Sequence, residues 1–368
     1  MNFNTIFLRS FRVLLLPFAL LYGFIIIIRN FLYDKNLLRS AEFNFPLICV
    51  GNLIVGGTGK SPMVEYLIEL LYPYFKVATL SRGYKRNTKG YVLATETTTA
   101  LEIGDEPMQF HIKFPGIAVA AGEERIVAIP QLLHDKPDTQ VIILDDAFQH
   151  RVVKAGFNIL LTQYEYLYTK DFFLPTGDLR DQRSSAKRAH IIIVTKCPAD
   201  LNDDEKNKII EELHPKDHQQ IFFTTTEYGL PYHVVSHAQR AISQNDEILL
   251  VSGIANPDPL KQFLSEHVSA YYQLQYNDHH IFTITDLKDI QKKFSSVVSD
   301  KKIIITTEKD AVRLLKFSDQ LSQLPLYVLP VKHKFLFGEG EQFNKKVIDF
   351  IQHFYMSEVE VNDDQNPG

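Results

Sequence analysis

The chain has 368 residues and a formal net charge of −5, with 45% hydrophobic and 23% charged residues. This length suggests two domains, each able to bury its own core, and the negative charge argues against non-specific nucleic-acid binding as the main function. The two cysteines, Cys49 and Cys197, are too few for a disulfide framework, which favours a reducing, cytosolic compartment.

The amino terminus differs in composition from the rest of the chain. Val13–Ile28 contains no charged residue, with Arg9 and Arg12 before it and Arg29 after it. As a helix this run would be about 24 Å long, shorter than the ~30 Å hydrocarbon core of a bilayer. A spanning helix and a cleaved signal peptide are alternatives. We favour a helix that dips into one face of the membrane, held by arginines that reach the headgroups.

A glycine-rich loop between a strand and a helix is the most informative stretch. The apolar run Leu47–Val50 predicts a buried strand, and Met63–Leu71 predicts a helix. Glycines between them let backbone N–H groups surround phosphate oxygens, and the helix N-terminus adds its dipole. Lys60 would reach the β- and γ-phosphates, and the Ser61 hydroxyl would bind Mg²⁺. The strict pattern has a glycine where this chain has an isoleucine, and the expected ATP contacts are Ile54, Val55, Gly56, Gly57, Thr58, Gly59, Lys60 and Ser61.

The next turns contain candidate site residues. Lys76–Leu80 predicts a second strand, and Arg82 and Tyr84 follow it, at the sheet edge where ligands of open α/β folds gather. This turn could bind phosphate or form a solvated loop. Asp105 stands at the start of a predicted helix, where acidic residues often only complement the helix dipole, so the residues alone favour a structural role for it.

A further apolar strand ends in carboxylates. Asp145 and Asp146 directly follow Val141–Leu144. This is the arrangement of a Walker B element, in which a carboxylate beside the phosphates holds Mg²⁺ or its water. Mixed charges around Arg180 and Asp181 could line the same site or form a solvated surface.

The alternation of strands and helices predicts an α/β fold. We expect a P-loop NTPase-like kinase domain at 31–220, with a largely parallel sheet flanked by helices, preceded by the membrane-associated N-terminal apolar helix at 1–30. A linker is expected at 221–240 and a second, smaller α/β domain at 241–355. The remaining residues, 356–368, are expected to form an acidic tail.

Two patterns that would indicate guanine specificity or zinc are incomplete. Pro198 stands where a base-reading aspartate should follow, and Thr307–Asp310 ends in the right residue but lies in the other predicted domain. Guanine specificity is therefore not supported. The adjacent His279 and His280 have no further ligand at helical spacing, which argues against zinc.

In combination, these motifs resemble the tetraacyldisaccharide 4′-kinase family, the lipid A 4′-kinases of Gram-negative bacteria. The resemblance extends from about Leu14 to Ala311, and the order of the motifs is highly specific. The family's phosphate loop also lacks the early glycine. The matching segments are the apolar N-terminal run, Val50–Pro62, Ser81–Tyr84, Gly104–Pro107, Asp145–His150, Leu174–Arg180, Asp278–His279 and Thr307–Ala311.

The resemblance implies roles for the matching residues. Asp105 and His279 would form a catalytic dyad between the domains, in which Asp105 takes a proton from the acceptor hydroxyl and His279 orients and tunes it. Lys60 and Arg180 would neutralise charge on the transferred phosphoryl group, and Asp278 would orient His279. The implied Mg²⁺ ligands are Ser61, Asp145, Asp146 and Asp181, the last where the family usually has glutamate. The implied acceptor-binding residues are Arg82, Tyr84, Arg125, Gln149 and His150.

The implied function is ATP-dependent phosphorylation of the 4′-hydroxyl of a tetraacyldisaccharide 1-phosphate, with ATP and Mg²⁺ as cofactors. We expect a peripheral, monotopic protein at the cytoplasmic face of the inner membrane. Its partners would be the lipid acceptor and the lipid surface, with no nucleic acid and no obligate protein partner. The alternatives are a membrane-tethered P-loop regulatory ATPase, which would not need the Asp105–His279 pair, and a cytosolic ligase, which would not need the apolar amino terminus.

Overall fold

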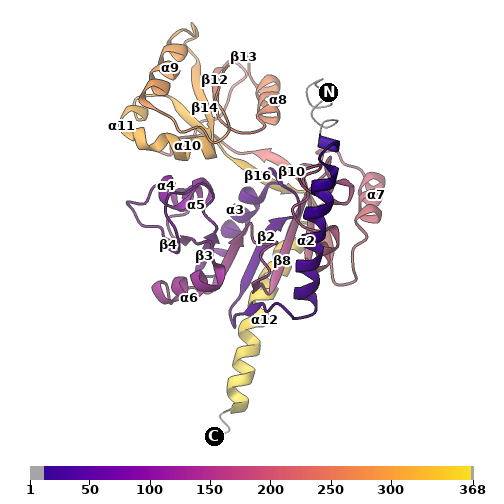
Figure 1. Cartoon of the computed structure of the whole chain (residues 1–368). Coiled ribbons are helices and arrows are strands. Elements are labelled where there is room, and N and C mark those ends of the chain that lie inside the picture. The colour runs from indigo at the N-terminus through magenta and orange to yellow at the C-terminus, as the bar shows by residue number, and fades with distance from the viewer. Residues whose placement is uncertain (1–11, 366–368) are drawn as a thin grey trace.

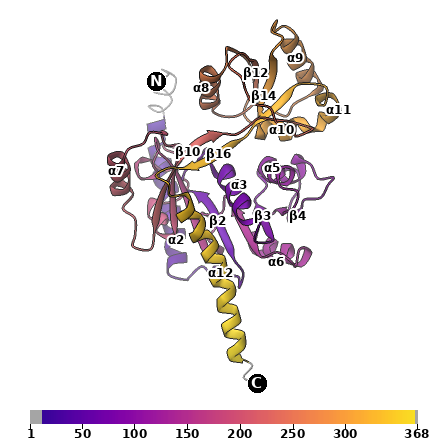
Figure 2. The same ribbon diagram turned by 180° about the vertical axis from the view of Figure 1, so that it is seen from behind.

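The computed structural model describes residues 12–365, which form two α/β domains (Figure 1). Figure 2 shows from behind that the smaller domain lies over one end of the larger one, while the C-terminal helix extends from the opposite end. Within the described residues the large domain has a nine-stranded sheet. Its strand order is β16 (Val331–Phe335), β10 (Gln220–Tyr228), β9 (Ile191–Thr195), β8 (Phe157–Gln163), β2 (Leu47–Asn52), β6 (Val141–Asp145), β3 (Val77–Ser81), β5 (Ala118–Ala121) and β4 (Val92–Leu93).

The centre of this sheet is parallel and buried on both faces, as the predicted α/β class requires. β2 pairs in parallel with β6 and β8, and β3 pairs in parallel with β5 and β6. Every residue of β2, β3, β6 and β9 is buried, which explains why these strands are continuous apolar runs in the sequence. A short parallel pair, β1 (Ala41–Glu42) with β7 (Val153–Lys154), lies outside this sheet.

Helices cover both faces of the large sheet. On one face, α3 (Lys60–Leu71), α5 (Asp105–Lys113) and α12 (Gly340–Gln365) contribute buried side chains to a common core. On the other face, α6 (Arg125–Asp135) and α7 (Asp203–Leu213) do the same. The short helix α4 (Ala100–Ile103) precedes α5 and is separated from it by Gly104, whose φ of 96° suits glycine.

The smaller domain is a second three-layer α/β unit. Its sheet has the order β11 (Tyr232–His233), β15 (Leu326–Leu329), β14 (Lys302–Thr307), β12 (Glu247–Ser252) and β13 (Ala270–Gln275). One face packs against α9 (Ile284–Ser295), α10 (Glu308–Leu314) and α11 (Ser318–Leu321), and the other against α8 (Asp258–His267).

The structure corrects the predicted domain boundaries. Residues 221–240 are not a free linker, because β10 pairs in parallel with β9 inside the large sheet. The chain then returns through β16, which pairs antiparallel with β10, and continues into α12. The smaller domain therefore ends before β16 rather than at residue 355. α12 continues to Gln365, so most of the range predicted as a tail is helical.

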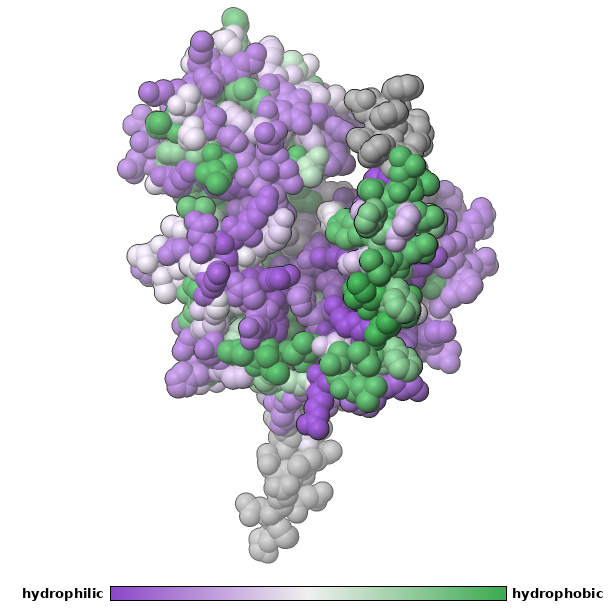
Figure 3. Space-filling model, in the orientation of Figure 1, coloured by the Kyte–Doolittle hydropathy of each residue, from purple (hydrophilic) through white to green (hydrophobic). Residues whose placement is uncertain are grey.

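The apolar amino terminus forms α2 (Leu16–Asp34), which lies along the large domain. A buried stripe of Ala19, Gly23, Ile26 and Asn30 faces the domain. Large apolar side chains on the outer face are exposed, and Figure 3 shows them as a continuous hydrophobic stripe. In the described part of the chain, α2 is the one helix with the length and composition to cross a membrane.

Candidate active site

The phosphate loop ends at the first residue of α3 and is held open by hydrogen bonds from its neighbours. Gly59, the N-cap of α3, has a φ of 85°, a left-handed conformation that disfavours other residues. Thr58 anchors the loop from inside: Asn52 donates to its hydroxyl over 2.8 Å, and the Thr195 hydroxyl donates to its carbonyl over 2.9 Å. Backbone N–H groups at the start of α3 therefore remain directed at an incoming anion.

Three charged residues converge beside this loop. Lys60 Nζ lies 3.7 Å from Asp146 Oδ1, and Arg180 Nη1 donates to Asp146 Oδ2 over 3.0 Å. Burial lowers the pKa of Lys60, an effect that Asp146 only partly offsets. Burial also acts to raise the pKa of Asp146, but the charges of Lys60 and Arg180 outweigh it and leave that pKa lowered. The two cations are thus placed to bind an additional anion.

Asp145 directly precedes Asp146 in the chain, and one of its carboxylate oxygens lacks a hydrogen-bond partner. The Ser81 hydroxyl donates to Oδ2 over 3.2 Å, whereas Oδ1 is buried and has no hydrogen-bond partner. Burial, followed by repulsion from Asp146 and Glu106, raises the Asp145 pKa to about 6. A buried carboxylate oxygen without a partner is costly, and a bound cation would satisfy it.

The oxygen atoms of these side chains suit Mg²⁺, which is bound only partly by protein, better than a metal ion whose ligands are all protein side chains. Within residues 12–365, no group of three His, Cys, Asp or Glu side chains is arranged to hold an ion. Mg²⁺ commonly takes one or two carboxylates and completes its shell with phosphate oxygens and water. Ser61, Asp145 and Asp146 match that requirement.

Asp181 does not match it, and the structure contradicts its predicted metal contact. The side chain is fully buried beneath α2. Its carboxylate accepts from Asn30 Nδ2 over 2.6 Å, from the Gln182 N–H over 2.8 Å and from Arg188 over 3.2 Å. Asp181 therefore fastens α2 to the domain, and its place directly after Arg180 in the sequence gave no sign of this orientation.

The predicted cross-domain pair is assembled in the structure. His279 Nδ1 donates to Asp105 Oδ2 over 3.0 Å, although the residues are 174 positions apart. Asp278 lies farther away, with its Oδ2 3.9 Å from His279 Nε2. His279 has a φ of 60°, and its backbone N–H donates to the Gly253 carbonyl over 3.2 Å. This uncommon backbone conformation directs the ring across the domain boundary.

Two of the residues predicted to bind the acceptor, Tyr84 and Arg125, contact residues already described. The Tyr84 ring is exposed and lies 5.7 Å from the His279 ring, measured between centroids. Arg125 is buried and donates to the Asp145 carbonyl over 2.9 Å, while its Nε has no partner. Burial, aided by the charges of Arg125 and Arg82, lowers the pKa of His150 to about 4, so this imidazole is neutral at pH 7.

Gln149 has a different environment from the other candidates. The side-chain amide of Gln149 donates to the Asn52 backbone carbonyl. The backbone carbonyl of Gln149 accepts from Arg29 of α2 over 2.9 Å. These contacts link the N-terminal helix to the strand that enters the phosphate loop.

Two charged residues that join the domains at this site were not among the residues predicted from the sequence. Arg313 Nε donates to Asp105 Oδ2 over 3.0 Å, and Lys309 bonds to Glu106 over 2.7 Å. Both cations belong to α10. Lys309 lies in the motif Thr307–Ala311, which is a signal that could have indicated it, whereas Arg313 lies two residues beyond that motif.

The chain is similar to known proteins over most of its length. A sequence model of the family Tetraacyldisaccharide-1-P 4′-kinase matches residues 11–352. The chain belongs to the tetraacyldisaccharide-1-P 4′-kinase family. A tetraacyldisaccharide 4′-kinase of Flavobacterium johnsoniae is 47% identical over 93% of this chain and 97% of its own length. Another of Bacteroides thetaiotaomicron is 42% identical over 92% of this chain and 93% of its own length.

A solved structure supports the same kinase fold. It is the crystal structure of LpxK from Aquifex aeolicus in complex with ATP, with 30% sequence identity and a TM-score of 0.72. The match covers 93% of this chain and 99% of that one. Both domains are therefore common to the two proteins, and the alternative of a regulatory ATPase is not favoured.

Proposed function

We propose that this protein transfers the γ-phosphoryl group of ATP to the 4′-hydroxyl of a tetraacyldisaccharide 1-phosphate, a lipid A precursor, at a membrane surface. The observation that supports this most directly is the contact between Asp105, in the domain that contains the phosphate loop, and His279, in the smaller domain. A regulatory ATPase has no need for a proton acceptor contributed across two domains.

The proposed reaction divides between two groups of residues. Asp105, oriented by His279, removes the proton of the acceptor hydroxyl. The hydroxyl oxygen then forms a bond to the γ-phosphorus, while the bond from that phosphorus to the bridging oxygen of ADP breaks. Lys60 and Arg180, which already neighbour Asp146, stabilise the charge on the transferred group.

Ser61, Asp145 and Asp146 are the residues proposed to hold Mg²⁺. Mg²⁺ would neutralise charge on the β- and γ-phosphates. The unpartnered Oδ1 of Asp145 supports this assignment.

We further propose that α2 lies in the membrane interface rather than spanning the bilayer. Arg12, before the helix, bonds to Asp178 over 2.7 Å, and Asp34 at its end bonds to Arg151 over 2.7 Å. Between these ends, Tyr22 donates to the Arg180 carbonyl over 3.0 Å. A helix attached to the large domain along its whole length could span a bilayer only if polar parts of that domain entered it too. The cytoplasmic leaflet is the face on which ATP is available.

Acceptor dependence tests the function. With Mg²⁺, ATP turnover should require added tetraacyldisaccharide 1-phosphate, and radioactivity from γ-labelled ATP should appear on the lipid. Turnover that continues at the same rate without acceptor, with no labelled lipid, would contradict the proposal.

A double-mutant cycle tests the dyad. Asp105→Ala and His279→Ala should each reduce turnover strongly, and the double variant should be little worse than the poorer single variant, because the two residues act as a unit. His280→Ala is the matched control, since this neighbouring histidine bonds instead to Asp286 over 3.0 Å. A coupling free energy below about 0.5 kcal/mol would remove the dyad from the mechanism.

A further inference from the structure

A lysine of the smaller domain reaches the candidate active site. Lys309 belongs to α10, which in Figure 1 lies at the lower edge of the smaller domain and faces α5 of the large domain. Its Nζ donates to Glu106 Oε1 over 2.7 Å across the domain boundary. Glu106 directly follows Asp105, the residue proposed to take the proton of the acceptor hydroxyl. Lys309 is therefore placed beside the groups that react.

The two cations of α10 that contact the first turn of α5 differ in how completely they are bound. The Arg313 side chain is only 6% exposed, and it bonds to both Asp105 and Asp310. The Lys309 side chain is 37% exposed, and among the described residues Glu106 is its one hydrogen-bond partner. An ammonium group has three N–H donors. Lys309 thus keeps donors for a further anion, whereas Arg313 is enclosed by its partners.

The position of Lys309 within its helix is unfavourable for a cation. α10 begins at Glu308, so Lys309 stands in the first turn. The first turn of a helix favours acidic residues because the backbone N–H groups give it partial positive charge, and Glu308 and Asp310 follow this preference. The helix itself therefore gives no reason for a lysine at this position.

The charges that act on Lys309 come from the dyad and from the proposed Mg²⁺ site. Burial acts to lower the pKa of Lys309, but the charge of Glu106, followed by those of Asp145 and Asp105, outweighs burial and leaves the pKa raised. The ammonium group is therefore charged at pH 7. It is a fixed cation within electrostatic range of the carboxylates of both sites.

Lys60 and Lys309 approach the same space from the two domains. Lys60 is the first residue of α3, at the end of the phosphate loop. Burial is the main cause that lowers the pKa of Lys60, and the charges of Arg180 and then Lys309 add to the effect. Cations that repel one another are stabilised by an anion bound among them. The phosphoryl group that is transferred carries the negative charge that this arrangement requires.

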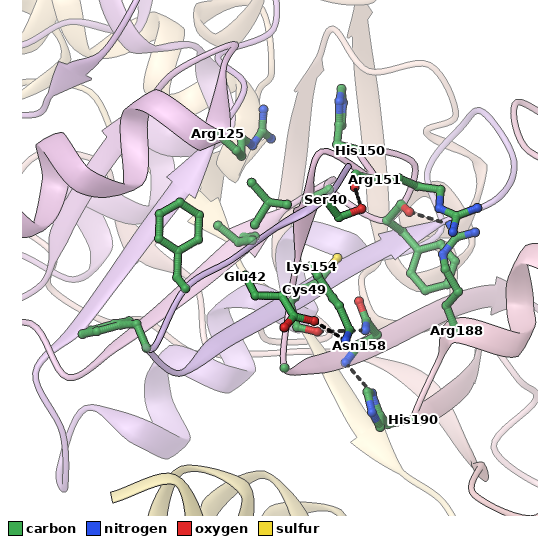
Figure 4. A pocket seen from close by; sticks show the side chains of 18 of the residues that line it. Ser40, Glu42, Cys49, Arg125, His150, Arg151, Lys154, Asn158, Arg188 and His190 are labelled. Atoms are coloured by element: carbon green, nitrogen blue, oxygen red, sulfur yellow. Dashed lines mark hydrogen bonds and ion pairs between the residues drawn. The ribbon is translucent and has the colours of Figure 1, made fainter. Parts of the chain in front are cut away.

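Other cations of the large domain line a separate pocket. Arg125 and Arg188 lie on opposite sides of this pocket, which has a volume of 590 Å³ (Figure 4). Lys60, Arg180 and Lys309 are not among the described residues that line it. The three cations that share the space beside the phosphate loop are therefore distinct from the arginines of the pocket.

We infer that Lys309 binds the transferred phosphoryl group, so that the smaller domain contributes a cation to the reaction as well as His279. The inference rests on the proposed function and adds one substrate-contacting residue to it. Lys309 would donate to a non-bridging oxygen of the γ-phosphoryl group, before and after that group is esterified to the acceptor. No proton changes place in this contact, because the ammonium group stays charged. Its charge would stabilise the equatorial oxygens in the transition state, while Glu106 positions the side chain.

Removing each partner of the ion pair in turn separates a cation that acts on the phosphoryl group from one that only joins the domains. Lys309→Gln should lower kcat by about a hundredfold to a thousandfold, the range for the loss of one donor to a reacting oxyanion. Glu106→Gln breaks the same ion pair but keeps the cation, and it should lower kcat by less than about tenfold. Lys316→Gln, which removes an exposed cation just after α10, is the control and should leave kcat unchanged.

The double variant Glu106→Gln, Lys309→Gln decides between the two roles, and it leaves no unpaired carboxylate at this ion pair that could prevent folding. If Lys309 acts on the phosphoryl group, its substitution should still lower kcat by at least about thirtyfold in the Glu106→Gln background. A double variant that is no slower than Glu106→Gln would mean that the two residues form only an ion pair, and the inference would be wrong.

Binding of a transition-state mimic provides a readout that does not depend on turnover. ADP with Mg²⁺ should bind wild type and Lys309→Gln equally, because Lys309 contacts only the transferred group. When aluminium fluoride takes the place of that group, with ADP, Mg²⁺ and acceptor present, calorimetry should show at least about tenfold weaker binding to the variant. Equal changes in affinity for the two ligands, or no change for either, would contradict the contact.

The outcomes separate this inference from the proposed function. If the wild-type chain transfers no phosphate to the acceptor, the proposed function fails. If the wild-type chain transfers phosphate and Lys309→Gln does so at the rate of Glu106→Gln, the function stands and Lys309 does not contact the phosphoryl group.

Discussion

Arg313 shows how one side chain can organise both halves of the site. Its Nε bonds to Asp105 Oδ2, and its Nη1 lies 3.3 Å from the Gly253 carbonyl and 3.2 Å from Asp310 Oδ1. The same Gly253 carbonyl accepts the N–H of His279. Arg313 therefore holds the Asp105 carboxylate directly and supports the backbone that presents His279.

We expect Arg313→Lys to lower kcat by roughly tenfold to a hundredfold, the effect of losing about 1.5–3 kcal/mol of charge-assisted hydrogen bonding. The KM for ATP should change little, because Arg313 acts on the dyad. Steady-state kinetics with each substrate varied separately measure this difference.

Arg240→Lys is the control, since Arg240 pairs with Asp246 within the smaller domain. In the Asp105→Ala background, Arg313→Lys should have almost no further effect on kcat. Equal losses in the presence and absence of Asp105 would show that Arg313 serves only general stability.

His333 is a second residue whose role became visible only in three dimensions. It lies on β16, and its Nε2 donates to the Gly59 carbonyl over 2.8 Å while Nδ1 accepts from the Thr224 hydroxyl over 3.0 Å. The bond at Nδ1 requires a neutral ring, because a protonated Nδ1 cannot accept a hydrogen bond. Burial is the main cause that lowers the pKa of His333 to about 4. The imidazole thus fastens the phosphate loop to the strand that returns from the smaller domain.

This environment predicts a pH dependence of stability. Because the folded-state pKa is lowered, the unfolded chain binds the proton first, so stability should fall as the pH drops from about 6.5 to about 4, by at most ~3 kcal/mol from this residue. His333→Gln should reduce that slope. Denaturant unfolding of both proteins at pH 7.5, 6, 5 and 4 measures it. Identical slopes would show that His333 is not the group that titrates.

At the scale of elements, the parallel strands were predictable because each is a short apolar run buried on both faces. The predicted strands Leu47–Val50, Lys76–Leu80 and Val141–Leu144 correspond to β2, β3 and β6. The pairing of β10 with β16 was not predictable, because Thr224 and its register partner Phe335 are 111 positions apart and nothing local identifies such a partner. The last turns of helix α12 were missed because they contain acidic residues that resemble a disordered tail.

The two faces of α2 explain both its attachment and its apolar surface. Its inward residues recur at the spacing of one helix face, from Ala19 through Gly23 and Ile26 to Asn30. The outward face carries large exposed side chains such as Phe18, Leu21 and Phe24, each about 60% exposed. The sequence predicted an apolar helix but did not reveal that Asn30 bonds to the buried Asp181.

Substituting only the outward face separates attachment from membrane binding. The triple variant Phe18→Gln, Leu21→Gln, Phe24→Gln should lose most of its flotation with liposomes, because each side chain contributes about 1.5–3 kcal/mol when buried in the interface. Its Tm without lipid should remain within about 2 °C of wild type, since these residues do not contact the domain core. The control Val298→Gln removes an apolar residue that is 96% exposed in the smaller domain. Unchanged flotation of the triple variant would exclude α2 as the anchor.

For the whole molecule, the candidate site depends on how the domains are held together. Sequence motifs indicated Asp105 and His279 as candidate site residues. Composition and periodicity, however, contain no information about the angle between two domains that are joined by β10 and β16. One contact between the domains joins Lys113 of α5 to Glu308 of α10, at 2.6 Å. Lys113 lies outside the recognised motifs and Glu308 lies inside one, but neither position indicates its partner, so only the folded structure identifies the contact.

Lys113 is the centre of a buried network across the boundary. Its Nζ bonds to Glu65 and to Glu308, each over 2.6 Å, and both carboxylates are nearly inaccessible. Glu308 also accepts the N–H of Val331, the first residue of β16, over 3.1 Å. Burial and then repulsion from Glu308 raise the pKa of Glu65 to about 7. The positive charge of Lys113 therefore offsets the charges of two buried carboxylates.

Removing the lysine should therefore loosen the domains as well as lower stability. In Lys113→Met, Glu65 and Glu308 would remain buried without their cation, a change that typically costs about 3–5 kcal/mol. We expect a lower Tm and, by small-angle scattering, a larger radius of gyration as the smaller domain moves away. The Asp105–His279 contact would be disrupted, and kcat should fall although no residue at the phosphate loop has changed.

The control is Lys332→Met, which breaks the exposed pair with Glu69 on the same side of the molecule and should cost less than about 1 kcal/mol. A Lys113→Met protein with wild-type scattering and kcat would mean that the hinge strands alone fix the angle between the domains.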